Sequence, residues 1–154
     1  MRQKNNRIWQ VSEISLRYEQ RIKLADSPMI HTSRDAWQIF YDHWSDDLEL
    51  LECFNVLFLN RANKVKGLFQ ASRGGVAGTV VDAKIIYGAA VKAMASSIIV
   101  AHNHPSGNLR PSHADEVLTT KLKNAGKALD IQFLDHLILT PDGRYTSFAD
   151  EGKL

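Results

Sequence analysis

The sequence predicts an α/β or α+β domain in which a mixed β-sheet is flanked by helices. Two observations support this fold class. Apolar runs rich in strand-forming residues, such as 50–60 and 97–101, alternate with segments in which apolar residues recur at helical spacing, such as 83–95 and 113–125. The length of 154 residues suits one domain with a single core.

Turn signals between these runs give the order of the elements. We expect a helix from Ser33 with an aromatic stripe at 37–44, strands at 50–60 and 65–71, a helix at 83–95, a strand at 97–101, a helix at 113–125 capped by Gly126, and strand segments at 131–133, 137–139 and 145–148. The polar pair Asp135-His136 interrupts the apolar residues after Gly126. The predicted buried residues of the helix at 113–125 are Ala114, Val117, Leu118, Leu122 and Ala125.

The first 29 residues differ in composition from the rest. Residues 1–23 hold six Lys/Arg against two Glu, a local charge of +4 in a chain whose net charge is +2. Apolar residues from Ile14 to Leu24 alternate with polar ones, which predicts a basic amphipathic strand that pairs with the domain's own sheet or with another subunit. We therefore divide the chain into an extension at 1–29, a domain at 30–149 and a tail at 150–154.

The composition also limits the compartment and the partners. One cysteine, Cys53, excludes an internal disulfide and suits a reducing cytoplasm. The polar residues 1–7 are followed by no apolar stretch of signal-peptide length, and no apolar run approaches a membrane span. We expect a cytoplasmic protein with no membrane association, and the net charge is too small to indicate nucleic acid by itself.

The most informative stretch is 97–115, where an apolar strand ends in two histidines. His102 and His104 are two residues apart, so in extended backbone both imidazoles can reach one point. Pro105 favours that extended backbone at His104. Asp115, in the first turn of the following helix, supplies a carboxylate. Two imidazoles and one carboxylate, with a fourth position left for water, form the ligand set of a catalytic zinc site, so we expect one zinc ion.

A simpler interpretation exists for each of these residues. Ser112 and Asp115 also match a capping box at the start of the helix. The two roles are compatible, because one carboxylate oxygen can accept the Ser112 amide while the other faces a metal. Taken singly, His102 and His104 would be ordinary partly buried histidines, whereas the pair at the end of an apolar strand favours a metal.

Two other kinds of His-x-His site are excluded. Zinc deaminases need a Pro-Cys-x-x-Cys partner, which a chain with one cysteine lacks. HNH nucleases share only the letters of His102-Asn103-His104, because their three residues are dispersed in sequence.

The full pattern resembles a known motif. His-x-His-Pro, six residues, Ser, two residues and Asp, with a glutamate upstream, is similar to the JAMM motif of the JAB/MPN metalloprotease superfamily. His-Asn-His-Pro-Ser-Gly at 102–107 and Leu134-Asp135-His136 resemble its RadC branch, and the resemblance covers about residues 30–149. It implies the layered α/β fold that JAB/MPN domains share with cytidine deaminases.

The resemblance also implies roles for two further residues. Glu52, by itself, is an acid among apolar residues that needs a partner if buried, or else an exposed carboxylate at a strand end. It falls where JAMM proteins place their catalytic glutamate, which makes it the expected general acid/base. Ser112 is the expected oxyanion donor. The implied activity is zinc-dependent hydrolysis of an amide or isopeptide bond in a peptide or protein substrate.

Alternatives remain open at this stage. The RadC name implies DNA repair, so the chain could be an accessory protein of repair or of a mobile element with a non-catalytic metal, or a metal-dependent nuclease. Asp135-His136 either orients the ligands from behind or anchors its strand as a satisfied buried pair. Residues 72–79, rich in glycine, predict a loop at the rim of the site. The sequence leaves the substrate undetermined and a homo-oligomer open.

Overall fold

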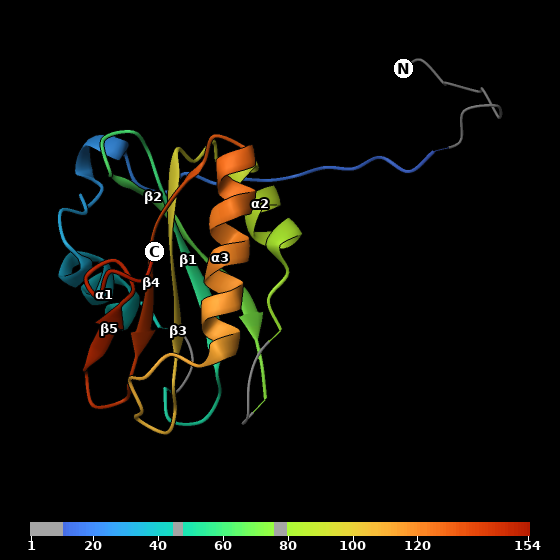
Figure 1. Ribbon diagram of the computed structural model, residues 1–154. Coiled ribbons are helices and arrows are strands. Elements are labelled where there is room, and N and C mark those ends of the chain that lie inside the picture. The colour runs from blue at the N-terminus through green and yellow to red at the C-terminus, as the bar shows by residue number, and fades with distance from the viewer. Residues whose placement is uncertain (1–10, 45–47, 76–79) are drawn as a thin grey trace, which may run out of the picture.

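The computed structural model describes residues 11–44, 48–75 and 80–154. Within them, a five-stranded sheet has the strand order β2-β1-β3-β4-β5 (Figure 1). The elements in chain order are the 3-10 helix η2 (Leu24–Asp26), α1 (Ser33–Asp42), β1 (Cys53–Leu59), β2 (Val65–Arg73), α2 (Ala83–Lys92), β3 (Ser97–Asn103), α3 (His113–Ala128), β4 (Gln132–Leu139) and β5 (Tyr145–Ser147).

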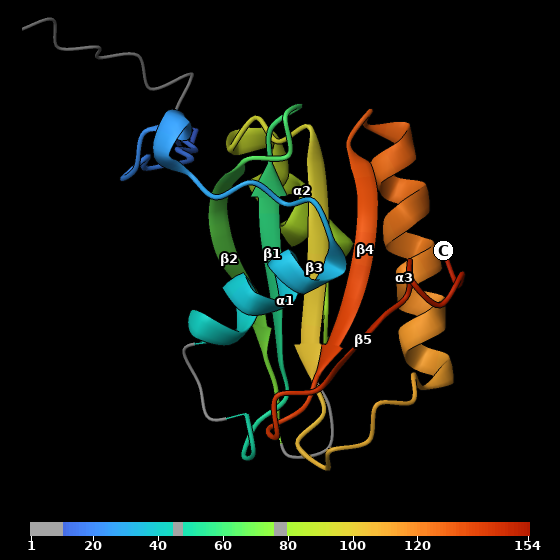
Figure 2. The same ribbon diagram turned by 90° about the vertical axis from the view of Figure 1, so that its left-hand side faces the viewer.

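These elements form three layers. Helix α1 covers one face of the sheet, and α2 and α3 cover the other face (Figure 2). Each face has its own apolar cluster, because residues of β1 and β3 alternate between Val56 and Val100 on the α2/α3 face and Leu57 and Ile99 on the α1 face. The predicted α/β class, a mixed sheet flanked by helices, is confirmed.

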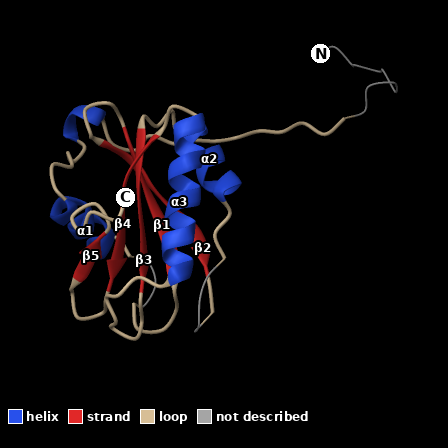
Figure 3. Cartoon of the chain, viewed as in Figure 1, coloured by secondary structure: helices blue, strands red, loops and turns tan. Residues whose placement is uncertain are grey.

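The strand directions determine what lies at the end of the sheet. Strands β3 and β4 are parallel and α3 connects them, whereas β1 is antiparallel to β3. The carboxyl end of β3, the start of α3 and the start of β1 therefore share one end of the sheet (Figure 3). The register pairs Phe54 with His102, so Glu52, two residues before Phe54, reaches the level of His104.

Several strand boundaries differ from the prediction. Strand β1 begins at Cys53, so Glu52 precedes the strand instead of lying inside it. Strand β4 runs without a break through Asp135-His136, so the prediction of two separate segments is wrong. A register shift against β3 accommodates Leu134, and the side chains of Asp135 and His136 both have buried hydrogen-bond partners.

Helix α3 corrects two further predictions. It continues to Ala128, so Gly126 lies inside it and is not its cap; the chain leaves the helix through Asp130, at a φ of 55°. A Cβ at position 126 would lie 2.5 Å from the Tyr87 hydroxyl and would also meet the Ile131 carbonyl. The buried face is also rotated from the predicted one, because α3 buries Thr119, whereas Val117 is exposed.

The segment from Ile14 to Leu24 does not pair with the domain's own sheet, and pairing with another subunit remains a prediction. The described part of the extension contains the short helix η2 and an isolated bridge from Met29 to Lys64, and Ile14 and Leu16 are exposed. The extension passes the sheet before it leads past α2 toward the N-terminus (Figure 1). An alternating pattern becomes a strand only when a neighbouring strand pairs with its backbone. Tyr18 is the exception to this exposure: it packs against the α2/α3-face cluster, and its hydroxyl donates to the Lys66 carbonyl over 2.9 Å.

Two other sequence expectations concern loops and membranes. Part of the predicted rim at 72–79, residues 76–79, lies outside the described residues, and Ser72 and Arg73 belong to β2. Among the helices in the described ranges, none has the length and apolar character needed to cross a bilayer.

Candidate metal centre

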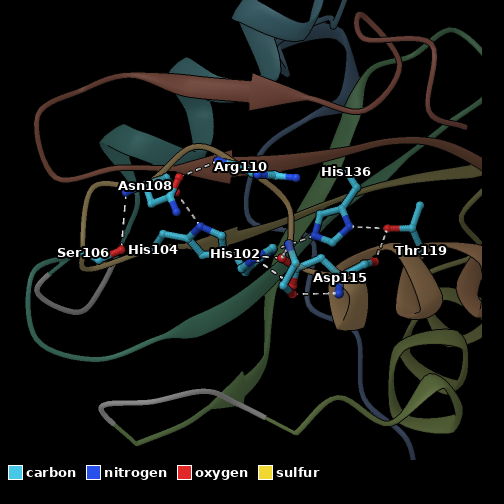
Figure 4. Close-up of polar contacts among 9 residues, drawn as sticks. His102, His104, Ser106, Asn108, Arg110, Asp115, Thr119 and His136 are labelled. Carbon is cyan, nitrogen blue, oxygen red and sulfur yellow. Dashed lines mark hydrogen bonds and ion pairs between the residues drawn. The ribbon is translucent and has the colours of Figure 1, made fainter.

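Three predicted ligands meet at the end of the sheet. His102 lies in β3, His104 directly follows that strand, and Asp115 lies in the first turn of α3 (Figure 4). His102 Nε2 lies 2.9 Å from His104 Nε2 and 3.2 Å from Asp115 Oδ1, and His104 Nε2 lies 3.5 Å from Asp115 Oδ2. In the part of the chain that the structure describes, this is the one group of His, Cys, Asp or Glu whose ligand atoms converge in this way.

The spacing of these atoms fits a small divalent ion. Nitrogen and oxygen ligands bind tetrahedral zinc at about 2.0–2.1 Å, which places any two ligand atoms about 3.3–3.4 Å apart. The two imidazole nitrogens are 2.9 Å apart, and each lies 3.2 or 3.5 Å from one of the two Asp115 oxygens, so the contacts fall close to that value. Two imidazoles and a carboxylate are also donors of the hardness that zinc prefers. The residues therefore fit the ion that the sequence predicts.

Asp115 has two roles, as the sequence allows. Its Oδ2 accepts the Ser112 N–H over 2.7 Å, while the Ser112 hydroxyl accepts the Asp115 N–H over 3.1 Å, so the capping box is confirmed. Its Oδ1 faces His102. Burial raises the pKa of Asp115, but the contacts of its carboxylate with the His102 and His104 rings outweigh burial and hold the pKa below its usual range. The carboxylate is therefore charged and oriented before any ion binds.

His104 is oriented by the loop that follows it. Its Nδ1 lies 2.6 Å from the Asn108 carbonyl, so Nδ1 carries a proton and Nε2 is left to face Asp115. Burial lowers the pKa of His104, but hydrogen bonds to Asp115 and to the Asn108 carbonyl outweigh burial and raise the pKa above its usual value. Arg144 helps to fix this loop by donating to the Gly107 carbonyl over 3.2 Å.

His102 is oriented by residues behind the site. His102 Nδ1 lies 2.7 Å from His136 Nε2, and His136 Nδ1 lies 2.7 Å from the hydroxyl of Thr119 on α3 (Figure 4). His136 is fully buried; burial lowers its pKa well below the usual value, and the nearby His102 acts in the same direction. His136 is therefore a neutral imidazole. Thr119 was not predicted as a site residue, because a single threonine on an otherwise apolar helix face does not by itself indicate a function.

Asp135 and His136 have different surroundings, although they are adjacent in β4. The register places His136 beside Val100 on the α2/α3 face and Asp135 beside Ile99 on the α1 face. Asp135 accepts the Ser147 hydroxyl over 2.5 Å and the Ala149 N–H over 2.9 Å. Both interpretations of the pair are therefore realised: His136 contacts a ligand, and Asp135 anchors the chain after β5.

Glu52 lies at the level of His104 at the end of the sheet and does not belong to the ligand group. Its side chain is half-buried, and its charge is close enough to contribute to the raised pKa of His104, after the larger effects of burial and hydrogen bonding. Its backbone carbonyl accepts the Gly74 N–H over 2.9 Å. The position suits a group that exchanges protons with a water molecule near the ligands, and this role remains a prediction.

Asn103 is a residue of the site that sequence reasoning missed. It is fully buried, and its amide donates to the Leu48 and Leu51 carbonyls over 2.9 and 2.8 Å, while its Oδ1 accepts the Cys53 N–H over 2.8 Å. These bonds hold the backbone on both sides of Glu52. The available signal was a buried amide between two ligands, at a strand end where backbone groups need partners.

Ser112 precedes the ligand Asp115 by three residues. It is the exposed N-cap of α3, and its hydroxyl accepts a backbone N–H, which leaves the hydroxyl proton available for donation. The predicted role as an oxyanion donor requires that proton, and the role remains a prediction.

Comparison with known proteins places this geometry in a family. The model of the RadC-like JAB domain matches residues 30–153. A UPF0758 protein of Flavobacterium johnsoniae is 50% identical over 101 residues, which are 66% of this chain and 44% of that protein. UPF0758 proteins of Porphyromonas gingivalis and Pelobacter propionicus are 48% identical over 99 residues and 38% identical over 122 residues, which are 64% and 76% of this chain.

The chain spans about half the length of these curated relatives, with matches covering 44% to 51% of each. The family model covers the whole of the sheet, the three α-helices and all five predicted site residues. The JAB superfamily includes hydrolases, which agrees with a ligand group built from two histidines and an aspartate. On these grounds, the chain belongs to the family of RadC-like JAB domains.

Proposed function

We propose that this chain is a zinc-dependent hydrolase of amide or isopeptide bonds in peptides or proteins. The observation that carries the proposal is the convergence of His102, His104 and Asp115, with Glu52 beside them at the same end of the sheet. Three protein ligands leave a fourth tetrahedral position for water or substrate, which is the arrangement of catalytic zinc sites.

The chemistry divides between the metal and the chain's own residues. Zinc in this position would supply a Lewis acid that makes water nucleophilic near neutral pH and polarises a carbonyl. The Glu52 carboxylate takes a proton from the attacking water and delivers it to the leaving amine nitrogen. The Ser112 hydroxyl donates to the carbonyl oxygen as negative charge develops there. Asn103 keeps Glu52 in place by holding the backbone before and after it.

The test separates metal binding from turnover. Wild type and Glu52→Gln are compared for zinc content and for cleavage of a library of internally quenched peptides that includes lysine-linked isopeptides. We expect equal zinc in both proteins and cleavage by wild type alone, with a loss of at least about a hundredfold for removal of a general acid/base. Glu116→Gln, which changes an exposed acid of α3 next to Asp115, is the matched control. Equal cleavage by wild type and Glu52→Gln would reject the mechanism.

A second candidate function is contact with nucleic acid through the extension. The observation that favours it is the exposure of Arg17, Arg21 and Lys23 in the basic extension. Fluorescence anisotropy with duplex and single-stranded DNA at rising salt tests it: neutralising these three residues should weaken binding and reduce its salt dependence. Absence of binding at low salt would reject it.

A plasmid-nicking assay with and without chelator tests nuclease activity at the same metal site.

A further inference from the structure

His136 is a buried polar residue that the proposed mechanism does not use. It lies between a ligand and a helix: its Nε2 is 2.7 Å from His102 Nδ1, and its Nδ1 is 2.7 Å from Thr119 Oγ1. Thr119 Oγ1 in turn lies 2.7 Å from the backbone carbonyl of Asp115. These contacts form a continuous line from the backbone of one ligand to the ring of another (Figure 4).

The direction of each hydrogen bond follows from the Asp115 carbonyl. A carbonyl oxygen only accepts, and two oxygens 2.7 Å apart without a hydrogen between them would repel each other, so the Thr119 hydroxyl donates there. The Thr119 oxygen must then accept from His136, whose Nδ1 carries the proton. His136 Nε2 is left with a lone pair and accepts the proton of His102 Nδ1.

The consequence falls on His102 Nε2. A neutral imidazole carries one N–H, so a proton held on Nδ1 leaves the Nε2 lone pair directed toward His104 and Asp115. The opposite tautomer would direct a hydrogen at the place where an ion has to bind.

The rings in this line are also fixed by packing. His136 stacks on Phe148, with ring centroids 4.8 Å apart, and meets Phe54 edge to face at 5.5 Å. His102 stacks over the same Phe54 at 6.1 Å. His102 and His136 are buried, so a ring that lost its partner could not exchange it for bulk water.

We propose that Thr119 and His136 are positioning residues that select the metal-binding tautomer of His102 and thereby set the affinity of the site. This inference rests on the proposed function, since it requires that His102, His104 and Asp115 bind a metal. Partners of metal-bound histidines typically change metal affinity by about ten- to a hundredfold when they are removed.

The experiment measures Zn²⁺ affinity of the full chain by competition with a chromophoric chelator at fixed pH. Thr119→Val keeps the shape of the side chain and removes the hydroxyl, and should weaken Zn²⁺ binding about ten- to a hundredfold. Thr119→Ser keeps the hydroxyl and should restore binding. Thr120→Val is the matched control, because Thr120 makes the same bond to the carbonyl four residues back, over 3.1 Å, on the exposed side of α3.

Thermal unfolding in the presence of chelator separates this role from a purely structural one. A structural role would lower the unfolding temperature of the metal-free Thr119→Val protein and leave the affinity of its folded fraction unchanged. That result, or wild-type affinity in Thr119→Val, would overturn the positioning role of Thr119 and His136 without contradicting the metal site itself. Failure of wild type to bind Zn²⁺ would overturn the proposed function and this inference together.

A measurement on wild type alone covers the case in which Thr119→Val does not fold. Long-range ¹H–¹⁵N correlation spectra of the Zn²⁺-loaded chain distinguish the two tautomers of each histidine. We expect the proton on Nδ1 in both His102 and His136. A proton on Nε2 of His136 would contradict the proposed positioning of His102 by Thr119 and His136.

Discussion

The two faces of the sheet treat the polar residues of β3 and β4 in opposite ways. On the α2/α3 face, His102 and His136 hydrogen-bond each other and lead to the candidate metal position. On the α1 face, Asn103 binds the backbone of residues 51 and 53 at the start of β1, and Asp135 binds the backbone of Ala149 after β5. Side chains alternate between the two faces of extended chain. The same two strands therefore direct His102 and His136 toward the candidate metal position, and Asn103 and Asp135 toward backbone groups that they bind; we call these last two the backbone clamps.

The largest expected effect comes from removing a ligand on the metal-directed side. His104→Ala should reduce zinc from about one ion per chain to near zero, because two remaining protein ligands do not hold the ion. Elemental analysis after gel filtration measures this. His113→Ala, which changes an exposed histidine at the start of α3, should retain the metal. Full zinc content in His104→Ala would show that the ion binds elsewhere.

The next effect comes from a backbone clamp. Asn103→Ala removes the hydrogen bonds of the Asn103 amide to the Cys53 N–H and to the Leu48 and Leu51 carbonyls, which should lower the unfolding free energy by about 3 kcal/mol. Zinc content should stay unchanged, because the ligand side chains are untouched, while peptide cleavage falls as Glu52 loses its support. Urea unfolding and elemental analysis check both points. Loss of zinc together with stability would mean that the two faces are not independent.

Packing on the α2/α3 face gives a smaller effect. Gly126→Ala places a Cβ against the Tyr87 hydroxyl and the Ile131 carbonyl, which should lower the unfolding free energy by about 1–3 kcal/mol. Removing the hydroxyl with Tyr87→Phe should recover part of this loss in the Gly126→Ala background. Gly88→Ala is the control, since it meets no atom within 4 Å and should stabilise α2 by up to about 1 kcal/mol. Equal stability of Gly126→Ala and wild type would contradict the close approach.

The smallest effect concerns the charge of the α1-face clamp. Burial raises the pKa of Asp135 above the ordinary 3.8, although its bonds to Ser147 and Ala149 oppose this. The folded state therefore binds this proton more tightly than the unfolded state, so the contribution of Asp135 to stability is greatest below about pH 4 and declines as the pH rises through the raised pKa.

Urea unfolding of wild type and Asp135→Asn, from below about pH 4 to above the raised pKa of Asp135, measures that decline. The stability of wild type relative to Asp135→Asn should fall by at most about 1.4 kcal/mol per pH unit, while their Zn²⁺ affinities stay equal. A difference that grows with rising pH would have the wrong sign.

The sequence predicts the parts of this molecule that depend on local spacing. His102, His104 and Asp115 converge as expected, because extended backbone and the first turn of a helix have fixed geometry. Thr119 and Asn103 escape prediction, because their importance lies in contacts to segments distant in sequence. The pairing of the segment from Ile14 to Leu24 with the domain's sheet, one of the two expected alternatives, is absent for the same reason: a partner strand has to come from elsewhere in the fold.

The break that the sequence predicts at Asp135-His136 is a second case in which contacts distant in sequence decide the structure. Two polar residues in an apolar run normally end a strand, since unpaired polar groups are costly to bury. Here His102 and Thr119 lie against one residue, and Ser147 and the Ala149 amide lie against the other. Only the assembled sheet supplies these partners, so the sequence pattern alone predicts two strand segments where the structure has one.

One consequence concerns how the native state should be recognised. The three ligands belong to one short segment, 102–115, so even a chain whose sheet has not assembled can gather them around an ion at little entropic cost. The backbone next to Glu52 meets its support on β3 across a separation of 50 residues, and it is held there only once β1 has docked. For the proposed zinc site, metal content is therefore a weaker test of correct folding than peptide cleavage. A chain whose β1 has not docked keeps the three ligands, at the lower affinity expected without His136, but lacks the support of Glu52.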